Sequence, residues 1–123
     1  MKFKTVAFDL DDVLCYRTSE EGGVQKYHSC KPIQQMIDVV NECYNSGMYI
    51  KIYTARGMSI FTGDTSKVYS SLFELTKKQL ADWGVQHNEL VMGKAHFDLL
   101  IDDKAVDSAA INTFQDVIRR LNK

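Results

Sequence analysis

The stretch that decides the fold is residues 3–14, Phe-Lys-Thr-Val-Ala-Phe-Asp-Leu-Asp-Asp-Val-Leu, in which an apolar run meets a cluster of acids. The run Phe3–Leu10 includes β-branched residues, which favours a β-strand. Asp9 and Asp11 are two positions apart, so an extended chain points both carboxylates to the same side. The stretch therefore predicts a strand that ends in two carboxylates facing one way.

Short apolar runs alternate with helical patterns along the rest of the chain. After a polar, irregular stretch from about Arg17 to Lys31, Pro32 is well placed to open a helix and Gly47 to stop it. This alternation predicts an α/β fold of the three-layer α/β/α, Rossmann-like kind, with a mainly parallel sheet. Beyond Phe3–Leu10, we expect strands at Met48–Thr54, Leu90–Met92 and Phe97–Ile101, and further helices from about Ser66 to Trp83 and after the cap Thr113.

The composition is that of an ordinary globular domain, and we expect residues 1–123 to form a single one. With 45% hydrophobic residues, 25% charged residues and a formal net charge of −1, nothing indicates a nucleic-acid-binding or membrane-surface protein. No apolar run reaches the ~18 residues of a membrane span, and the N-terminus lacks a signal-peptide pattern. Three cysteines without Cys-x-x-Cys spacing argue against a disulfide framework or a zinc site and predict reduced thiols in a cytoplasmic protein.

Polar residues follow each of the expected strands. In parallel sheets, ligands bind beyond the carboxyl ends of the strands. The segments found there are Asp9–Asp12, Thr54–Gly57, Gly93-Lys94 and Asp102-Asp103. The sequence thus gathers its chemically active residues at one edge of the predicted sheet.

This set of residues suits a metal ion and a phosphate group. Carboxylates ~4 Å apart repel by about 4 kcal/mol at an effective dielectric of 20, so the acidic cluster needs a cation. All-oxygen ligands favour a hard ion, and Mg²⁺ is the usual choice beside phosphate. The Thr54 hydroxyl, the backbone N–H groups of Ala55 and Arg56, and the Lys94 charge form a phosphate cradle. The Arg56 side chain is left open between a substrate contact and a structural salt bridge.

Within such a cradle, the first two carboxylates have natural roles. Asp9 attacks phosphorus to give an aspartyl-phosphate. Asp11, on the same side, gives a proton to the leaving oxygen and later takes one from water.

Four segments in order resemble the motifs of the haloacid dehalogenase superfamily. The first is Phe8–Leu14, which contains the Asp-x-Asp pattern, and the others are Thr54, Lys94 and Leu99–Asp103. The phrases Tyr53–Met58, Gly93-Lys94 and Ile101–Val106 resemble a small group of capsule-biosynthesis phosphatases of that superfamily. The chain departs from the usual pattern at Asp12, where many members have glycine or asparagine, and at Ala95, where such relatives often have proline.

The resemblance implies roles for these residues and a magnesium cofactor. Asp9 would be nucleophile and metal ligand, and Asp11 would be acid/base and would bind the metal through its backbone carbonyl. Asp102 would be a metal ligand and Asp103 a ligand or an outer partner, while Thr54 and Lys94 would hold the phosphoryl group. The stretch from about Cys15 to Cys30 would be the flap beside the site. Because there is no room for a separate cap domain, the site would be open, closed by a neighbouring subunit of a homo-oligomer, or suited to a large substrate.

These expectations lead to one hypothesis with two alternatives. The hypothesis is a Mg²⁺-dependent phosphomonoesterase acting on a small sugar or polyol phosphate in polysaccharide biosynthesis. One alternative is a signalling receiver domain, whose phosphoacceptor aspartate ends a middle strand, where this chain has Thr54–Gly57. The other is a catalytically silent relative that binds a phosphorylated ligand.

Overall fold

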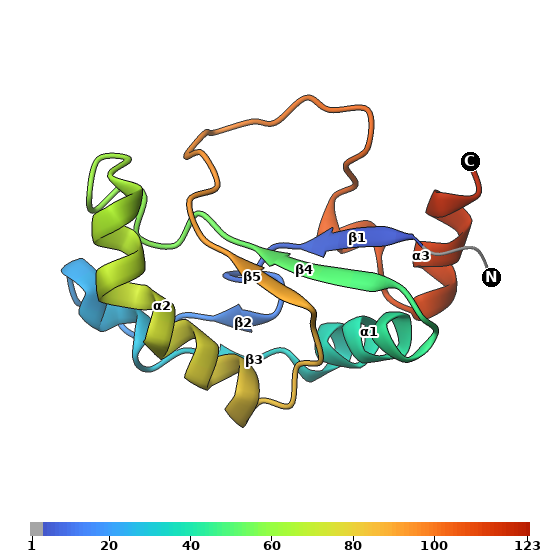
Figure 1. The fold of residues 1–123 in the computed structure, drawn as a ribbon, viewed down its shortest axis with the longest axis horizontal. Helices are drawn as coiled ribbons and strands as arrows, with labels where there is room; N and C mark the ends of the chain where they lie inside the picture. The colour runs from blue at the N-terminus through green and yellow to red at the C-terminus, as the bar shows by residue number, and fades with distance from the viewer. Residues whose placement is uncertain (1–3) are drawn as a thin grey trace.

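The core of the protein is a three-stranded parallel sheet, seen in a computed structural model that describes residues 4–123 (Figure 1). Strands β1 (Thr5–Phe8), β4 (Tyr49–Tyr53) and β5 (Glu89–Val91) pair in the order β1-β4-β5. In β4, Ile50 and Ile52 are fully buried and alternate with half-exposed neighbours, as a central strand requires. The first three strands predicted from the sequence are therefore confirmed, since each observed strand overlaps its predicted range. Phe3, where the first was expected to begin, lies outside the described residues.

In the described residues, three α-helices connect and flank the strands: α1 (Gln34–Asn45), α2 (Thr65–Asp82) and α3 (Phe114–Leu121). The buried residues of α1 include Met36, Ile37, Val40 and Cys43, which lie on one stripe at helical spacing. Helices α1 and α3 pack against each other, and α1 also contacts β4 (Figure 1). Within residues 4–123, no helix combines the length and apolar character needed to cross a bilayer.

The helix ends follow from capping side chains. The Asp64 carboxylate accepts hydrogen bonds from the backbone N–H groups of Ser66 and Lys67 and so opens α2. Thr113 and Asp116 form a reciprocal capping box at the start of α3. All three predicted helices are confirmed, and the predicted cap Thr113 acts at the expected position.

The stretch expected to be irregular contains short elements of its own. Strands β2 (Cys15–Tyr16) and β3 (Lys31–Pro32) pair antiparallel, with Cys15 opposite Pro32. Between them lies the 3₁₀-helix η1 (Gly23–Tyr27), whose Tyr27 is buried. This pairing brings residues 15 and 32 together, and Ile33 N–H donates to Leu14 O in the loop that follows β1.

The strand predicted at Phe97–Ile101 is wrong. This run is an exposed loop on the way from β5 to the 3₁₀-helix η2 (Ser108–Ala110), and it arches away from the sheet in Figure 1. Leu99 is 77% exposed and Ile101 is 89% exposed. An apolar, strand-like composition shows only that residues suit a pleated surface, and a strand forms only where a neighbouring edge pairs with them. In the described part of the chain, β1 pairs only with β4 and its other edge takes no partner strand.

Candidate active site at the carboxyl ends of the strands

The loop after β1 is held by two buried leucines. Leu10 and Leu14 are fully buried, and Leu14 N–H donates to Leu10 O at 2.8 Å. Between them Asp12 takes a φ of 67°, in the left-handed region that short polar residues tolerate better than branched ones. The loop therefore turns sharply between the two anchors. This turn leaves the Asp9 side chain 38% exposed and the Asp11 side chain 16% exposed.

The three parallel strands bring Asp9, Thr54 and Lys94 together. Lys94 Nζ lies 3.4 Å from Asp9 Oδ2, and Lys94 N–H donates to Thr54 O at 3.1 Å. Thr54 N–H in turn donates to Val91 O at 3.0 Å, so the ends of β4 and β5 are joined at this point. These three residues therefore lie at the edge of the sheet where its parallel strands end, as the sequence predicts. The site has one carboxylate and one cation in contact, and the buried Thr54 hydroxyl accepts a hydrogen bond from Arg56 N–H at 3.0 Å.

A pocket of about 290 Å³ extends from this point, and Lys94 and Asp102 both line it. Lys94 Nζ also lies over the rings of Tyr53 and Phe97, at 5.8 and 5.5 Å from their centroids. The aromatic rings and the Asp9 carboxylate together hold the ammonium group of Lys94, which lines this pocket.

The four predicted metal ligands are not gathered into one cluster. Among residues 4–123, the one group of three or more candidate ligands is Asp11, Cys15 and Cys30, and it includes none of Asp9, Asp102 and Asp103. Asp102 is exposed, and Lys104 N–H donates to its Oδ1 at 2.9 Å, which lowers the pKa of the Asp102 carboxyl. The separation has a clear cause. The run Phe97–Ile101, which was expected to carry Asp102 to the edge of the sheet, is not a strand.

The Arg56 side chain forms a buried salt bridge with Asp11. Its Nε and Nη2 donate to the two carboxylate oxygens of Asp11 at 3.1 and 2.8 Å, and its Nη1 donates to Thr76 and Gln79 at 3.1 and 2.6 Å. The side chain has no exposed surface. Burial opposes its charge, but the hydrogen bonds and charge of Asp11 outweigh burial and raise the pKa of Arg56. Of the two roles left open for this side chain, the structure has the salt bridge.

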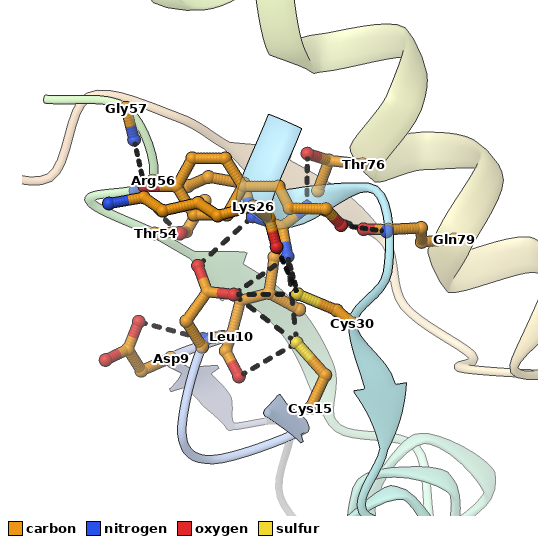
Figure 2. A network of polar contacts seen from close by, with 12 residues as sticks. Asp9, Leu10, Cys15, Lys26, Cys30, Thr54, Arg56, Gly57, Thr76 and Gln79 are labelled. Carbon is orange, nitrogen blue, oxygen red and sulfur yellow. Dashed lines mark hydrogen bonds and ion pairs between the residues drawn. The ribbon is translucent and has the colours of Figure 1, made fainter. Parts of the chain in front are cut away.

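Two thiols complete the surroundings of the Asp11 carboxylate, and Figure 2 labels both cysteines. Cys15 and Cys30 lie 3.4 and 3.9 Å from Asp11 Oδ1, and Arg56 Nη2 lies 3.7 and 3.8 Å from their sulfur atoms. Burial, followed by the charge of Asp11, raises the pKa of the Cys15 thiol, and burial also raises that of Cys30. Both side chains are therefore neutral donors near pH 7. These cysteines are fifteen positions apart in the sequence, so no spacing motif revealed the pair.

Sequence reasoning also missed the polar groups of α2 that hold Arg56. Thr76 and Gln79 are buried on the same side of α2 as Val68, Leu72 and Leu80. A polar side chain within an apolar helical stripe is the one available signal, because a buried polar group requires a partner. That signal identifies a buried contact, but it does not identify Arg56 as the partner.

The chain thus has an α/β fold with a three-stranded parallel sheet, and Asp9, Thr54 and Lys94 lie beyond the carboxyl ends of its strands. No protein-family model matches the chain, and no curated protein matches it. Its structure is similar to the crystal structure of an MCSG target from Vibrio cholerae, with a TM-score of 0.77 and 25% sequence identity. The similarity covers 97% of this chain and 98% of that chain, and no function is stated for the Vibrio cholerae protein.

Proposed function

We propose that the protein is a Mg²⁺-dependent phosphomonoesterase that works through an aspartyl-phosphate on Asp9. The observation that carries the proposal is the contact of Asp9 with Lys94, at 3.4 Å, beside the buried Thr54. A carboxylate nucleophile next to a cation and a hydroxyl is the arrangement that transfer of a phosphoryl group requires. The resemblance to the haloacid dehalogenase superfamily supports the same reading, with a three-layer arrangement of the fold.

The first step transfers the phosphoryl group to the protein. A carboxylate oxygen of Asp9 forms a bond to phosphorus while the bond from phosphorus to the leaving oxygen breaks, and the electron pair goes to that oxygen. For this step Asp11 is in its acid form, with one oxygen released from Arg56 to carry the proton that it gives to the leaving oxygen. Lys94 offsets the negative charge of the phosphoryl oxygens, and Thr54 donates a hydrogen bond to one of them.

The second step restores the protein. Water attacks phosphorus while Asp11 takes one of its protons, and the bond from phosphorus to Asp9 breaks with its electrons returning to the carboxylate. The products are inorganic phosphate and an alcohol, which is the balance of phosphomonoester hydrolysis. Asp11 returns to its acid form and Asp9 to its ionised form, so a single turnover consumes one water molecule.

The donor set fits Mg²⁺, because carboxylate and carbonyl oxygens are the ligands that this ion prefers. The Asp9 carboxylate, the Asp11 carbonyl and the Asp102 carboxylate would hold it, with Asp103 as a further ligand or an outer partner. The pocket shared by Lys94 and Asp102 supports the inclusion of Asp102. When bound, the ion supplies positive charge to the carboxylates and to the phosphoryl oxygens.

Full assembly of this donor set requires residues 97–101 to approach β1. That strand has an open edge, and the run is apolar and exposed. Addition of the run as a fourth strand would carry Asp102 toward Asp9. Hydrogen exchange of the backbone N–H groups of residues 97–101, with and without Mg²⁺ and phosphate, tests this step, and slower exchange with both present is the expected result.

We infer from the resemblance that the substrate is a small sugar or polyol phosphate of polysaccharide biosynthesis. The test is phosphate release from a panel of sugar, polyol and nucleotide monophosphates with and without Mg²⁺. Asp9→Asn is expected to abolish release, whereas Asp82→Asn, the same change at an exposed position of α2, is expected to leave it intact. Full activity in Asp9→Asn would remove Asp9 as the nucleophile. Metal-dependent binding without hydrolysis would favour the silent relative, and a long-lived phosphoprotein after acetyl-phosphate treatment would favour the receiver.

A further inference from the structure

The Arg56 guanidinium connects helix α2 to Asp11. One edge of the group, Nη1, is held by Thr76 Oγ1 at 3.1 Å and by Gln79 Oε1 at 2.6 Å. The opposite edge, Nε and Nη2, meets both oxygens of Asp11. Figure 2 shows Arg56 reaching Thr76 and Gln79 on one side. Because the guanidinium is a rigid fork, fixing one edge fixes the direction in which the other edge donates.

The plane of the guanidinium is fixed as well. The Arg56 carbon Cζ lies 4.7 Å from the centroid of the Tyr27 ring, which stacks against the group. Tyr27 is itself held at two points, since its hydroxyl accepts from Gly57 N–H at 3.1 Å and its carbonyl accepts from Gln79 Nε2 at 2.6 Å. Gln79 therefore contacts both Arg56 and the residue that stacks on Arg56. The Gln79 amide therefore holds one edge of the Arg56 guanidinium and also supports the Tyr27 ring that lies against its face.

Burial makes these contacts difficult to replace. Thr76 is fully buried, Gln79 is 8% exposed, and the Arg56 side chain has no exposed surface. Bulk water does not reach these buried groups, so removal of the Gln79 amide leaves Arg56 Nη1 with Thr76 Oγ1 as its acceptor. The guanidinium then has freedom to rotate, and Asp11 moves with it.

We propose that Gln79 and Thr76 are positioning residues for Asp11 and act through Arg56. The inference rests on the proposed function, in which Asp11 moves a proton to and from the leaving oxygen. Proton transfer requires the carboxyl group within hydrogen-bond reach of that oxygen, and a misplacement of about 1 Å can cost on the order of 100-fold in rate. A residue that only stabilises the fold would change the amount of active protein, but not the dependence of its rate on the leaving group.

The experiment compares two substrates for each variant. An alkyl phosphate such as glycerol 2-phosphate has a basic leaving oxygen that needs a proton, whereas p-nitrophenyl phosphate has a weakly basic one that does not. The variants are Gln79→Met and Thr76→Val, which remove the polar atoms with little change in side-chain volume. Gln35→Met is the matched control, because Gln35 lies exposed on α1 and, among residues 4–123, its amide hydrogen-bonds only to Asn112 O.

For Gln79→Met we expect kcat/KM, which covers only the steps up to transfer of the phosphoryl group to Asp9, to fall about 10- to 100-fold on the alkyl phosphate and less than about 3-fold on the aryl phosphate. In contrast, kcat also includes the attack of water, in which Asp11 acts whatever the leaving group is. For Thr76→Val we expect a smaller excess loss on the alkyl phosphate over the aryl phosphate, and for Gln35→Met we expect no excess loss. The ratio of the two kcat/KM values is measured on one preparation, so a loss of folded protein cancels from it. A variant that folds poorly therefore still gives a valid ratio.

Equal losses on the two substrates, or no loss on either, in both Gln79→Met and Thr76→Val would overturn the positioning role. That result is distinct from failure of the proposed function. A wild-type protein that hydrolyses neither substrate refutes the phosphatase and the positioning role together. An active wild type with an inactive Asp9→Asn and an unchanged ratio in both α2 variants refutes the positioning role alone.

Discussion

Replacement of Arg56 by methionine tests how the protein stabilises its buried ion pair. Methionine keeps much of the aliphatic volume of arginine and removes every donor. The change leaves the Asp11 carboxylate, the Gln79 amide oxygen and the Thr76 hydroxyl without the donors they have in the structure. An unpaired buried charge of this kind costs about 3–5 kcal/mol. For a chain of this length we expect a fall in the melting temperature of about 15 °C, based on the usual entropy of unfolding per residue.

A double-mutant cycle separates the pair from other effects of the substitution. Asp11→Ala alone leaves the guanidinium buried and unpaired, and is expected to cost a similar amount. Because the double variant Asp11→Ala/Arg56→Met has neither charge, we expect it to be about 2–3 kcal/mol more stable than the sum of the two single changes predicts.

The assay is urea unfolding of the wild type and the three variants, followed by circular dichroism, with a check that the slope against urea stays constant. The control cycle uses Lys78 and Asp82 on α2, which lie 2.6 Å apart but are exposed. There we expect a coupling of at most about 0.5 kcal/mol. If the two cycles give equal coupling, or if Asp11 and Arg56 are additive within about 0.5 kcal/mol, the reasoning from burial is refuted.

Three further predictions concern stability. Gly57→Ala is expected to lower the free energy of unfolding in urea by about 2–4 kcal/mol, because Gly57 has a φ of +81° and a Cβ there would lie 2.5 Å from Leu72 Cδ1. The control is Gly63→Ala, where φ is the same and the space is open, and we expect a cost of only about 1 kcal/mol. Equal costs would show that the contact with Leu72 does not matter. Asp12→Gly is expected to be neutral or stabilising and Asp12→Val to cost about 1–2 kcal/mol, owing to the left-handed φ of 67°; equal stability of the two variants would contradict this. Burial raises the pKa of the Cys43 thiol from 9.0 to about 11, so its contribution to stability is complete below pH 9 and is lost as the pH rises to 11. The stability advantage of the wild type over Cys43→Ala should therefore narrow across that range, and a constant difference would count against the assignment.

Local patterns predicted most of the secondary structure. The apolar spacing of α1 and the cap of α3 lie within a few residues of the elements they define, and β4 is a short buried run. Such signals depend on neighbours in the chain. The meeting of Asp9, Thr54 and Lys94 was also predictable, because parallel strands bring their carboxyl ends to one edge of the sheet.

The parts that could not be predicted depend on distant neighbours. Arg56 pairs with Asp11 across 45 positions and with Gln79 across 23, and no local pattern specifies either partner. At Phe97–Ile101 the error was the opposite, because a strand was predicted that does not form. Its composition is that of a strand, but pairing depends on whether the rest of the fold offers it an edge.

The open edge of β1 and the exposed run at residues 97–101 also have a consequence for handling the protein. An unpaired strand edge offers backbone N–H and C=O groups to any other chain, and the run Phe-Asp-Leu-Leu-Ile carries a single charge among four apolar side chains. Self-association in concentrated solution should begin here, by sheet extension between molecules. Sulfate and similar salts, which strengthen apolar contacts, will lower the solubility limit further.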